Sequence, residues 1–239
     1  MPRVFLTAQW RYLLMVNYEI APDVLRPYVP AGTELDVWHG TTLISMVGFL
    51  FLDTRVSGVA VPFHRDFEEV NLRFYVRRRA DDGWRRGVVF IKEIVPRVAI
   101  ATIARLLYNE NYIARPMRHA VDLPEHAGPG SVAYRWRYRG RWNGLSAHTV
   151  GSAQPLTGGS EAAFITEHYW GYAAQRDGGC VEYQVEHPRW RVWPAIDAVL
   201  DCDVHALYGE SFVDALCATP TSAFVADGSP IMVRRGKKI

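Results

Sequence analysis

The clearest periodic pattern in the chain runs over residues 69–79, where apolar and polar side chains alternate. Successive side chains of an extended strand point to opposite faces. One face carries Val70, Leu72, Phe74 and Val76, and the other carries Asn71, Arg73, Tyr75 and Arg77. A turn sequence follows at 81–83, and residues 87–94 are again mostly apolar. The pattern predicts a half-buried strand that forms a hairpin with the next one.

Strand patterns also dominate the rest of the chain, at residues 12–18, 37–52, 131–142, 145–150 and 181–186. Asn143-Gly144 favours a type I′ turn between the third and fourth of these segments. Short helices are expected at 22–26, 98–107 and 160–172, the last with Ser160 as N-cap. We predict an α+β, mainly β protein with an antiparallel sheet or barrel, forming one domain over residues 1–239.

Composition supports a globular protein, with 239 residues, 49% of them hydrophobic and 22% charged. The net charge of +2 is far from that of a dedicated nucleic-acid binder. The three cysteines form no CxxC pair, which argues against a disulfide framework or a zinc ribbon. The longest apolar run, 43–52, is shorter than the about 20 residues of a spanning helix, and no secretory signal is legible. We therefore expect a cytoplasmic location.

Several chemistries lack their sequence motifs. There is no GxSxG, P-loop, GxGxxG or HExxH, and the eight histidines form no tight cluster with cysteines. We expect no metal and no cofactor. Only three of the 27 basic residues are lysines, namely Lys92, Lys237 and Lys238. A reaction that needs a lysine amine therefore has very few candidate residues. Glu93 beside Lys92 favours the charged amine and disfavours it as a nucleophile.

Arginines alternate with Tyr134, Trp136 and Tyr138, an arrangement that could bind single-stranded nucleic acid by stacking and phosphate contacts. On a strand, however, the two kinds of side chain fall on opposite faces, so buried aromatics and solvated arginines are the plainer interpretation. Two polar groups lie beside apolar segments, Arg11 and the pair Glu68-Glu69. Taken alone, they are better explained as a surface pair or a salt bridge at the end of a sheet.

Short strings distributed along the chain resemble a bacterial family of unassigned function, the YqjF-type family. They are FLTAQWR (5–11), PYVP (27–30), FEEVNLR (67–73), ARLLY (104–108), FITEHY (164–169) and HPRW (187–190). This family is distantly similar to acetoacetate decarboxylase. The resemblance implies a cone-shaped antiparallel β-barrel with a few peripheral helices around an internal pocket.

The resemblance also implies site residues. Arg11 precedes Val29-Pro30 by the distance at which the decarboxylases place their pocket arginine before a Val-Val-Pro turn. Glu69 matches the pocket glutamate of the decarboxylases. Ser45 stands at the position where those enzymes have a second pocket glutamate. Where those enzymes carry Tyr-Pro-Lys-Lys, this chain has Glu-Asn-Tyr-Ile at 110–113, so Tyr112 or its neighbour Asn111 replaces the Schiff-base lysine. A phenol cannot form an imine with a ketone.

The prediction is a barrel whose pocket binds a small oxo or carboxylate ligand without the Schiff-base lysine. Arg11, Glu69 and Tyr112 are the candidate catalytic residues. The candidate pocket wall consists of Ser45, Asn111, His168 and His187, although each histidine is more simply explained as structural. The alternative is a lysine-independent lyase, hydratase or tautomerase acting on an enolisable carbonyl acid. Further alternatives are a non-enzymatic interaction protein or a single-stranded nucleic-acid binder, and the resemblance allows a homo-oligomer.

Overall fold

The computed structural model describes residues 2–60, 65–96 and 111–239. The long strands are β1 (Val4–Glu19), β3 (Leu43–Val56), β5 (Phe67–Ala80), β6 (Gly83–Val95), β14 (Arg191–Asp201) and β15 (Ser222–Arg234). The shorter ones are β2 (Glu34–Leu35), β4 (Val59–Ala60), β7 (Tyr112–Ala114), β8 (Met117–Asp122), β9 (Gly130–Tyr138), β10 (Arg141–Thr149), β11 (Gln154–Pro155), β12 (Trp170–Ala174), β13 (Cys180–Glu186) and β16 (Lys237–Lys238).

The helices are short. They are α1 (Pro22–Leu25), α3 (Glu161–Thr166), α4 (Val204–Tyr208) and α5 (Val213–Leu216), with 3₁₀ turns at Arg26–Tyr28 and Glu210–Phe212. Within the described residues, none of them has the length and apolar character needed to cross a membrane. The helix expected at 98–107 lies outside the described residues.

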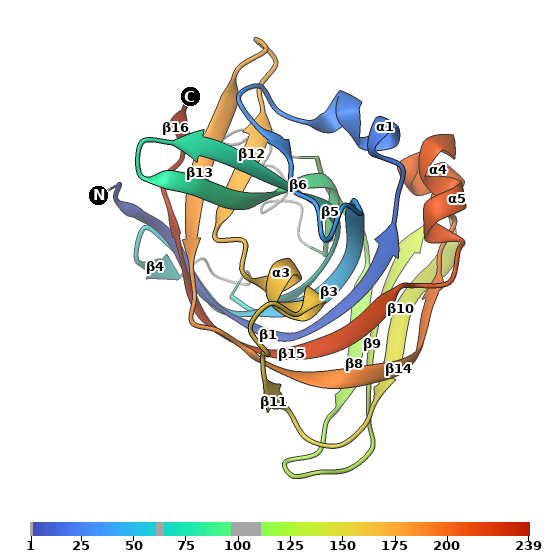
Figure 1. Cartoon of the computed structure of the whole chain (residues 1–239). Coiled ribbons are helices and arrows are strands. Elements are labelled where there is room, and N and C mark those ends of the chain that lie inside the picture. Colours follow the sequence, from blue (N-terminus) through green and yellow to red (C-terminus); the bar gives the residue numbers. More distant parts are fainter. Residues whose placement is uncertain (1, 61–64, 97–110) are drawn as a thin grey trace.

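The central feature is a closed ring of strands, seen end-on in Figure 1. Its order is β1, β3, β5, β6, β12, β13 and β15, and β15 pairs again with β1. All neighbours are antiparallel except β6 and β12. The ring leaves no open edge between its first and last members. It confirms the predicted mainly antiparallel β-barrel with a few peripheral helices.

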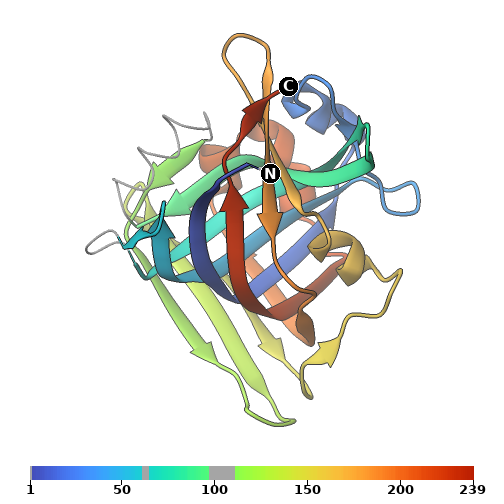
Figure 2. The same ribbon diagram turned by 90° about the vertical axis from the view of Figure 1, so that its left-hand side faces the viewer.

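A second layer covers part of the ring. Beyond β15 the sheet continues through β14, β10 and β9 to β8, which we call the outer sheet, and its strands extend past the ring in Figure 2. Tyr134 and Trp136 of β9 are fully buried between the outer sheet and the ring, whereas Arg135 and Arg137 are exposed. The expectation of buried aromatics and solvated arginines is confirmed, and these two rings are not available for base stacking.

Two local predictions were wrong. The β9–β10 hairpin turns at Arg139 and Gly140, both with positive φ as a type I′ turn requires. Asn143-Gly144 lies inside β10 instead, where the buried Asn143 accepts a hydrogen bond from the backbone N–H of Asp203. The helix at 160–172 begins as predicted, with Ser160 accepting from the N–H of Ala163, but it ends at Thr166 and Trp170 already starts β12.

Strand β5 determines the character of the ring interior. Its alternation is confirmed, since Val70, Leu72, Phe74 and Val76 all pack in the core between the ring and the outer sheet. The opposite side faces the interior, because Phe67 and Tyr75 on that side pack with interior residues of β1, β3 and α3. Asn71, Arg73 and Tyr75 on this side are buried, so the expected half-burial was wrong. The ring therefore has an interior with polar and charged side chains.

Candidate functional site

Glu69 and Tyr112 meet in the ring interior. Glu69 lies on the interior side of β5 and is 3% exposed. β7 runs parallel to β6 with Tyr112 opposite Glu93, and this pairing brings the Tyr112 hydroxyl within 3.5 Å of Glu69 Oε2, to which it donates. The other carboxylate oxygen of Glu69 accepts a hydrogen bond of 2.9 Å from Asn71 Nδ2. The structure thus brings together two of the three predicted catalytic residues.

Glu93 is a second interior carboxylate, and sequence reasoning gave it no site role. It is 1% exposed and lies opposite Asn71 in the register of β5 and β6. A register shift between these strands at Leu72 and Arg73 puts Glu93 on the interior side and Lys92 on the outer one. The only sequence signal for a buried charge here was the Lys92-Glu93 pair within an apolar run. Simple alternation does not say which of these two residues faces the interior.

Arg11 does not share this interior. It is opposite Leu50 in β3, and Leu50 is opposite Glu68 in β5, so all three point to the outer side. Its guanidinium donates to Gln9 Oε1 at 2.8 Å. The cause is a bulge in β1 at Tyr12, where φ is 55°. The expectation that Arg11 and Glu69 line one pocket was therefore wrong.

An interior arginine exists elsewhere, at Arg73. It lies on the same side of β5 as Glu69 and is 8% exposed. Among the described residues its polar contact is a long one, from a terminal nitrogen to Met15 Sδ at 3.8 Å, and its Nε has no hydrogen-bond partner there. The guanidinium carbon lies 5.8 Å from the ring centre of Tyr75. The alternating pattern predicted its side of the strand but assigned that side to solvent.

The two predicted histidines lie near Arg73. His187 stacks on Trp190 with ring centres 4.2 Å apart, beside the interior ring of Trp10. Burial lowers the pKa of His187, and the positive charge of Arg73 contributes in the same direction. His168 is buried between Tyr75 and Phe164, with ring centres at 4.7 and 5.1 Å. Both histidines pack against side chains of the ring interior.

His168 is held by a buried carboxylate. Its Nε2 lies 3.2 Å from Asp36 Oδ2, which also accepts a 2.6 Å hydrogen bond from Arg86 Nε. Burial alone raises the pKa of Asp36, but the hydrogen bonds from His168 and Arg86 outweigh it and lower the pKa below its usual value. Burial lowers the pKa of His168 to about 4, so the imidazole is neutral at pH 7. Nε2–H then donates to Asp36.

Ser45 and Asn111 have different surroundings. Ser45 is fully buried and belongs to a hydrogen-bonded chain, since it contacts the Tyr75 hydroxyl and donates to Asn17 Oδ1 at 2.6 Å. Asn17 continues the chain by donating to Ser222 at 2.8 Å. Asn111 is exposed, and its side chain donates to the carbonyl of Ile91. Ser45 therefore ties three strands together around the interior, whereas Asn111 lies at its edge.

The three lysines lie away from these groups. Lys92 points to the outer side of the ring, where its amine donates to the carbonyl of Leu207 and lies over the ring of Tyr208. Burial, and then the charge of Arg115, lower its pKa. In β16, Lys237 pairs with Glu182 and Lys238 with Asp177.

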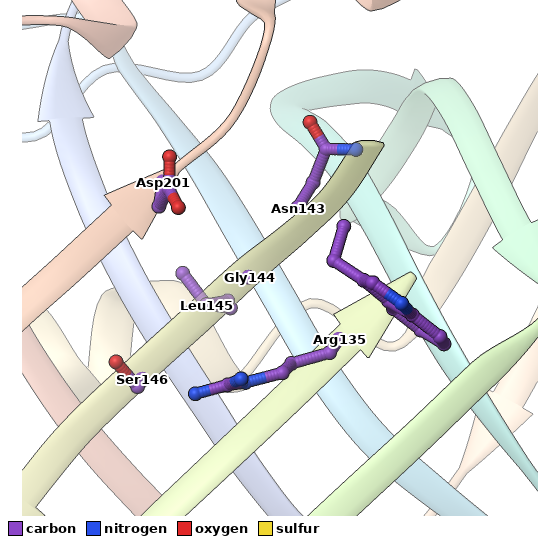
Figure 3. A pocket seen from close by; sticks show the side chains of 7 residues that line it. Arg135, Asn143, Gly144, Leu145, Ser146 and Asp201 are labelled. Carbon is purple, nitrogen blue, oxygen red and sulfur yellow. The ribbon is translucent and has the colours of Figure 1, made fainter. Parts of the chain in front are cut away.

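A separate pocket of about 130 Å³ lies on the outer sheet (Figure 3). It is lined by Arg135, Trp142, Asn143, Gly144, Leu145, Ser146 and Asp201. Asp201 pairs with Arg141, and both side chains are more than half exposed. No predicted site residue lines it. Because an exposed ion pair holds its geometry weakly, we place the candidate site in the ring interior.

Solved structures define the class of fold. An acetoacetate decarboxylase from Legionella pneumophila superposes with a TM-score of 0.69 over 98% of this chain and 87% of that chain, at 14% identity. An acetoacetate decarboxylase-like enzyme from Sphingomonas wittichii RW1 gives 0.70 over 99% and 94%, also at 14% identity. The enduracididine biosynthesis enzyme MppR gives 0.67 over 100% and 90%, at 12% identity. The chain has the acetoacetate decarboxylase-like fold.

The family follows from the sequence match. Residues 7–230 match the family DUF2071, described as an uncharacterized conserved protein, and the chain belongs to this family. It is also 35% identical over 75 residues to the uncharacterized protein YqjF of Bacillus subtilis. That match spans 31% of each protein, so this chain covers about a third of its curated relative. The resemblance to a YqjF-type family is confirmed.

Proposed function

We propose that the ring interior binds a small ligand carrying an oxo or carboxylate group, without covalent lysine chemistry. The observation that carries this proposal is the buried Glu69 carboxylate, which faces the interior and accepts from the Tyr112 hydroxyl. A buried carboxylate and a phenol are a proton acceptor and a hydrogen-bond donor for a carbonyl compound. Arg73, buried without a counter-ion among the described residues, supplies a site for an anion.

The positions of the lysines support a non-covalent mode of binding. Lys92 lies on the outer side of the ring. By the resemblance, Tyr112 or its neighbour Asn111 takes the place of the Schiff-base lysine. A protein of similar fold binds a small oxo acid, since MppR forms complexes with pyruvate and with the condensation product of pyruvate and imidazole 4-carboxaldehyde. A lysine-free interior would bind such a compound only through hydrogen bonds and charge.

Binding is tested by calorimetric titration with acetoacetate, 4-oxopentanoate and 6-oxoheptanoate. We expect saturable binding of at least one of these acids, weakened about tenfold by Arg73→Gln, because the cationic partner of the carboxylate is lost. Arg77→Gln is the matched control, since Arg77 lies on the same strand and pairs with Glu34 in an exposed position. Borohydride added to the complex should leave the protein mass unchanged. A stable adduct on Lys92, or no binding by any of the three acids, would contradict the proposal.

A catalytic version of this function is favoured by the contact between Glu69 and Tyr112. Glu69 would take a proton from the carbon next to the carbonyl, and the electron pair would move onto the carbonyl oxygen, which accepts a hydrogen bond from Tyr112. Return of a proton from Glu69 to the same or another atom of the enolate gives exchange or tautomerisation. The proton transfer itself is that of a tautomerase, and the same enolate-forming step begins the lyase and hydratase reactions of an enolisable carbonyl acid.

Proton exchange separates a catalyst from a binding protein. In D₂O, the protons next to the ketone of a bound oxo acid should exchange faster with the protein than without it, as followed by NMR. Glu69→Gln should remove the acceleration, and Glu210→Gln should retain it, since Glu210 is exposed. If an oxo acid binds but its protons exchange at the uncatalysed rate, the catalytic version is contradicted and the protein only binds the acid.

A further inference from the structure

β8 is the free margin of the outer sheet. Among the strands that the structure describes it pairs with β9 alone, and in Figure 2 it is the yellow-green strand at the margin of that sheet. Its pairing with β9 runs without a register shift from Met117 to Asp122, and these residues include neither proline nor lysine. Bulges, prolines and lysines are common means of keeping an edge strand from pairing. Within the described part of the chain, nothing prevents another strand from pairing with the free side of β8.

A second copy of the same strand would have to pair in particular registers. In an antiparallel pair, residues directly opposite each other either both exchange backbone hydrogen bonds across the gap or both direct these groups away from it. The two kinds of residue alternate along a strand. When the two strands are identical, each residue is therefore opposite one at an even distance from it in the sequence, and a twofold axis passes between two copies of one residue. Opposite side chains then lie on the same face of the sheet.

Charge favours one of these registers. Arg118 and Asp122 are four residues apart, and both are exposed on the face of the outer sheet that is turned away from the ring. An axis at Ala120 places Arg118 opposite Asp122 of the second copy, and the symmetry forms this pair twice. An axis at Arg118 itself would place two arginines opposite each other, which is unfavourable. An axis at His119 or Val121 would leave both charges without an opposite one.

Arg118 has no carboxylate partner within the described part of the chain. The residue directly opposite it on β9 is a second arginine, Arg135, and its guanidinium carbon lies 4.2 Å from the ring centre of Trp142. Asp122, near the other end of β8, has no cationic partner among the described residues. A carboxylate on the free side of Arg118 would offset the repulsion between the two arginines. β8 thus carries two charges that complement each other across a twofold axis.

We infer that two copies of this chain associate through β8, with a twofold axis at Ala120 that joins their outer sheets into one continuous sheet. Backbone hydrogen bonds between the two strands supply most of the affinity. The exposed pairs of Arg118 and Asp122 contribute little to affinity and instead select the register. Because one short strand from each copy forms the contact, we expect a dissociation constant on the order of 10 µM. The inference does not depend on the proposed function, since β8 is not part of the ring.

Sedimentation equilibrium at about 1 to 100 µM protein measures the association, and the wild type should pass from one chain to two over this range. Arg118→Asp should weaken the dimer about tenfold, because it places two carboxylates opposite each other on both sides of the axis. Asp122→Arg should do the same with two arginines. The double variant Arg118→Asp/Asp122→Arg should restore the wild-type dissociation constant, since the charges are exchanged. Arg137→Asp is the matched control, because Arg137 is exposed on the same face but lies on β9.

A cysteine at the axis tests the register directly. Opposite Cα atoms of an antiparallel pair are about 4.5 to 5.5 Å apart, within the range that a disulfide spans. Ala120→Cys, in a Cys217→Ser background that removes the exposed native thiol, should therefore form a disulfide-linked dimer on mild oxidation. Ala133→Cys is the matched control. Ala133 is opposite Ala120 on β9, so its two copies would lie three strand spacings, about 14 Å, apart.

Far-ultraviolet dichroism verifies that every variant is folded. A wild type that remains a single chain up to about 100 µM would overturn the inference. Equal dissociation constants for Arg118→Asp and Arg137→Asp, or equal disulfide yields from Ala120→Cys and Ala133→Cys, would also overturn it, because the interface would then lie elsewhere. A double variant that dimerises no better than Arg118→Asp would contradict the register, since exchanged charges should pair as well as the native ones.

Discussion

Replacing Gly228 with alanine should lower the free energy of unfolding by about 4 kcal/mol, the largest effect that we expect from a single substitution. Gly228 has φ of +80°, and a Cβ atom built there would lie 2.0 Å from the carbonyl oxygen of Trp10. Neither strand can move aside easily, because Gly228 is opposite Arg11, at the point where β1 has its bulge. The strained φ and the backbone clash each lower the free energy of unfolding, and the two losses add.

Gly140→Ala is the matched control for this substitution. Gly140 also has a positive φ, of +82°, but a Cβ atom there would meet nothing within 4 Å. It should therefore cost only the conformational part, about 1 kcal/mol. Urea unfolding of both variants measures the difference. Equal losses of stability would show that the close approach of β15 to Trp10 is not what makes glycine necessary.

Acidification from pH 7 to pH 5 should destabilise the protein by about 2 kcal/mol through His168 alone. The pKa of His168 is about 4 in the folded protein, because the ring is buried, and about 6.5 in an unfolded chain. The unfolded state therefore binds more protons between pH 6.5 and 4, and stability falls as the pH decreases through this window. Asp36 acts at lower pH, since its pKa is below the usual value of an aspartate.

Urea unfolding at pH 7, 6 and 5 measures this dependence for the wild type and for His168→Gln. The variant should lose most of the pH dependence of the free energy of unfolding. We assign the remaining pH dependence to His187, because burial also lowers its pKa. His148→Gln is the control, because His148 is exposed on β10. Parallel pH profiles for the wild type and His168→Gln would mean that His168 titrates alike in the folded and unfolded states.

The sequence predicted the strands, and which residues lie on the same face of a strand, better than it predicted which face is exposed to solvent. Period-2 alternation groups Asn71 with Arg73 correctly, but it gives the same signal whether their side meets solvent or a closed interior. Only the pairing of β13 with β15, far along the chain, encloses that side. The pattern gave no reason to place Glu69 near residue 112, whereas the resemblance predicted one site for both, and the two side chains lie in contact in the structure.

Single-residue irregularities caused the other errors. Counted by alternation, Arg11 shares the side of Leu13 and Met15, which face the interior. The bulge at Tyr12 inserts one residue and moves Arg11 to the opposite side. Similarly, Asn143-Gly144 has the preferred composition of a tight turn, but the strands pair in a register that puts the turn at Arg139-Gly140. Long-range pairing determined both outcomes, and neither bulge nor register leaves a reliable local signal.

The closure of the ring also bears on how the protein is made. β1 is synthesised before the other described strands, yet one of its two neighbours is β15, which lies more than 200 residues further along the sequence. Pairings between such distant segments form slowly, because the intervening chain must first be ordered. Glu69, Asn71 and Arg73 therefore leave the ribosome long before the strands that enclose them. During synthesis this side of β5 is exposed to solvent. The apolar side chains around these three residues are then the surface that a chaperone would have to protect.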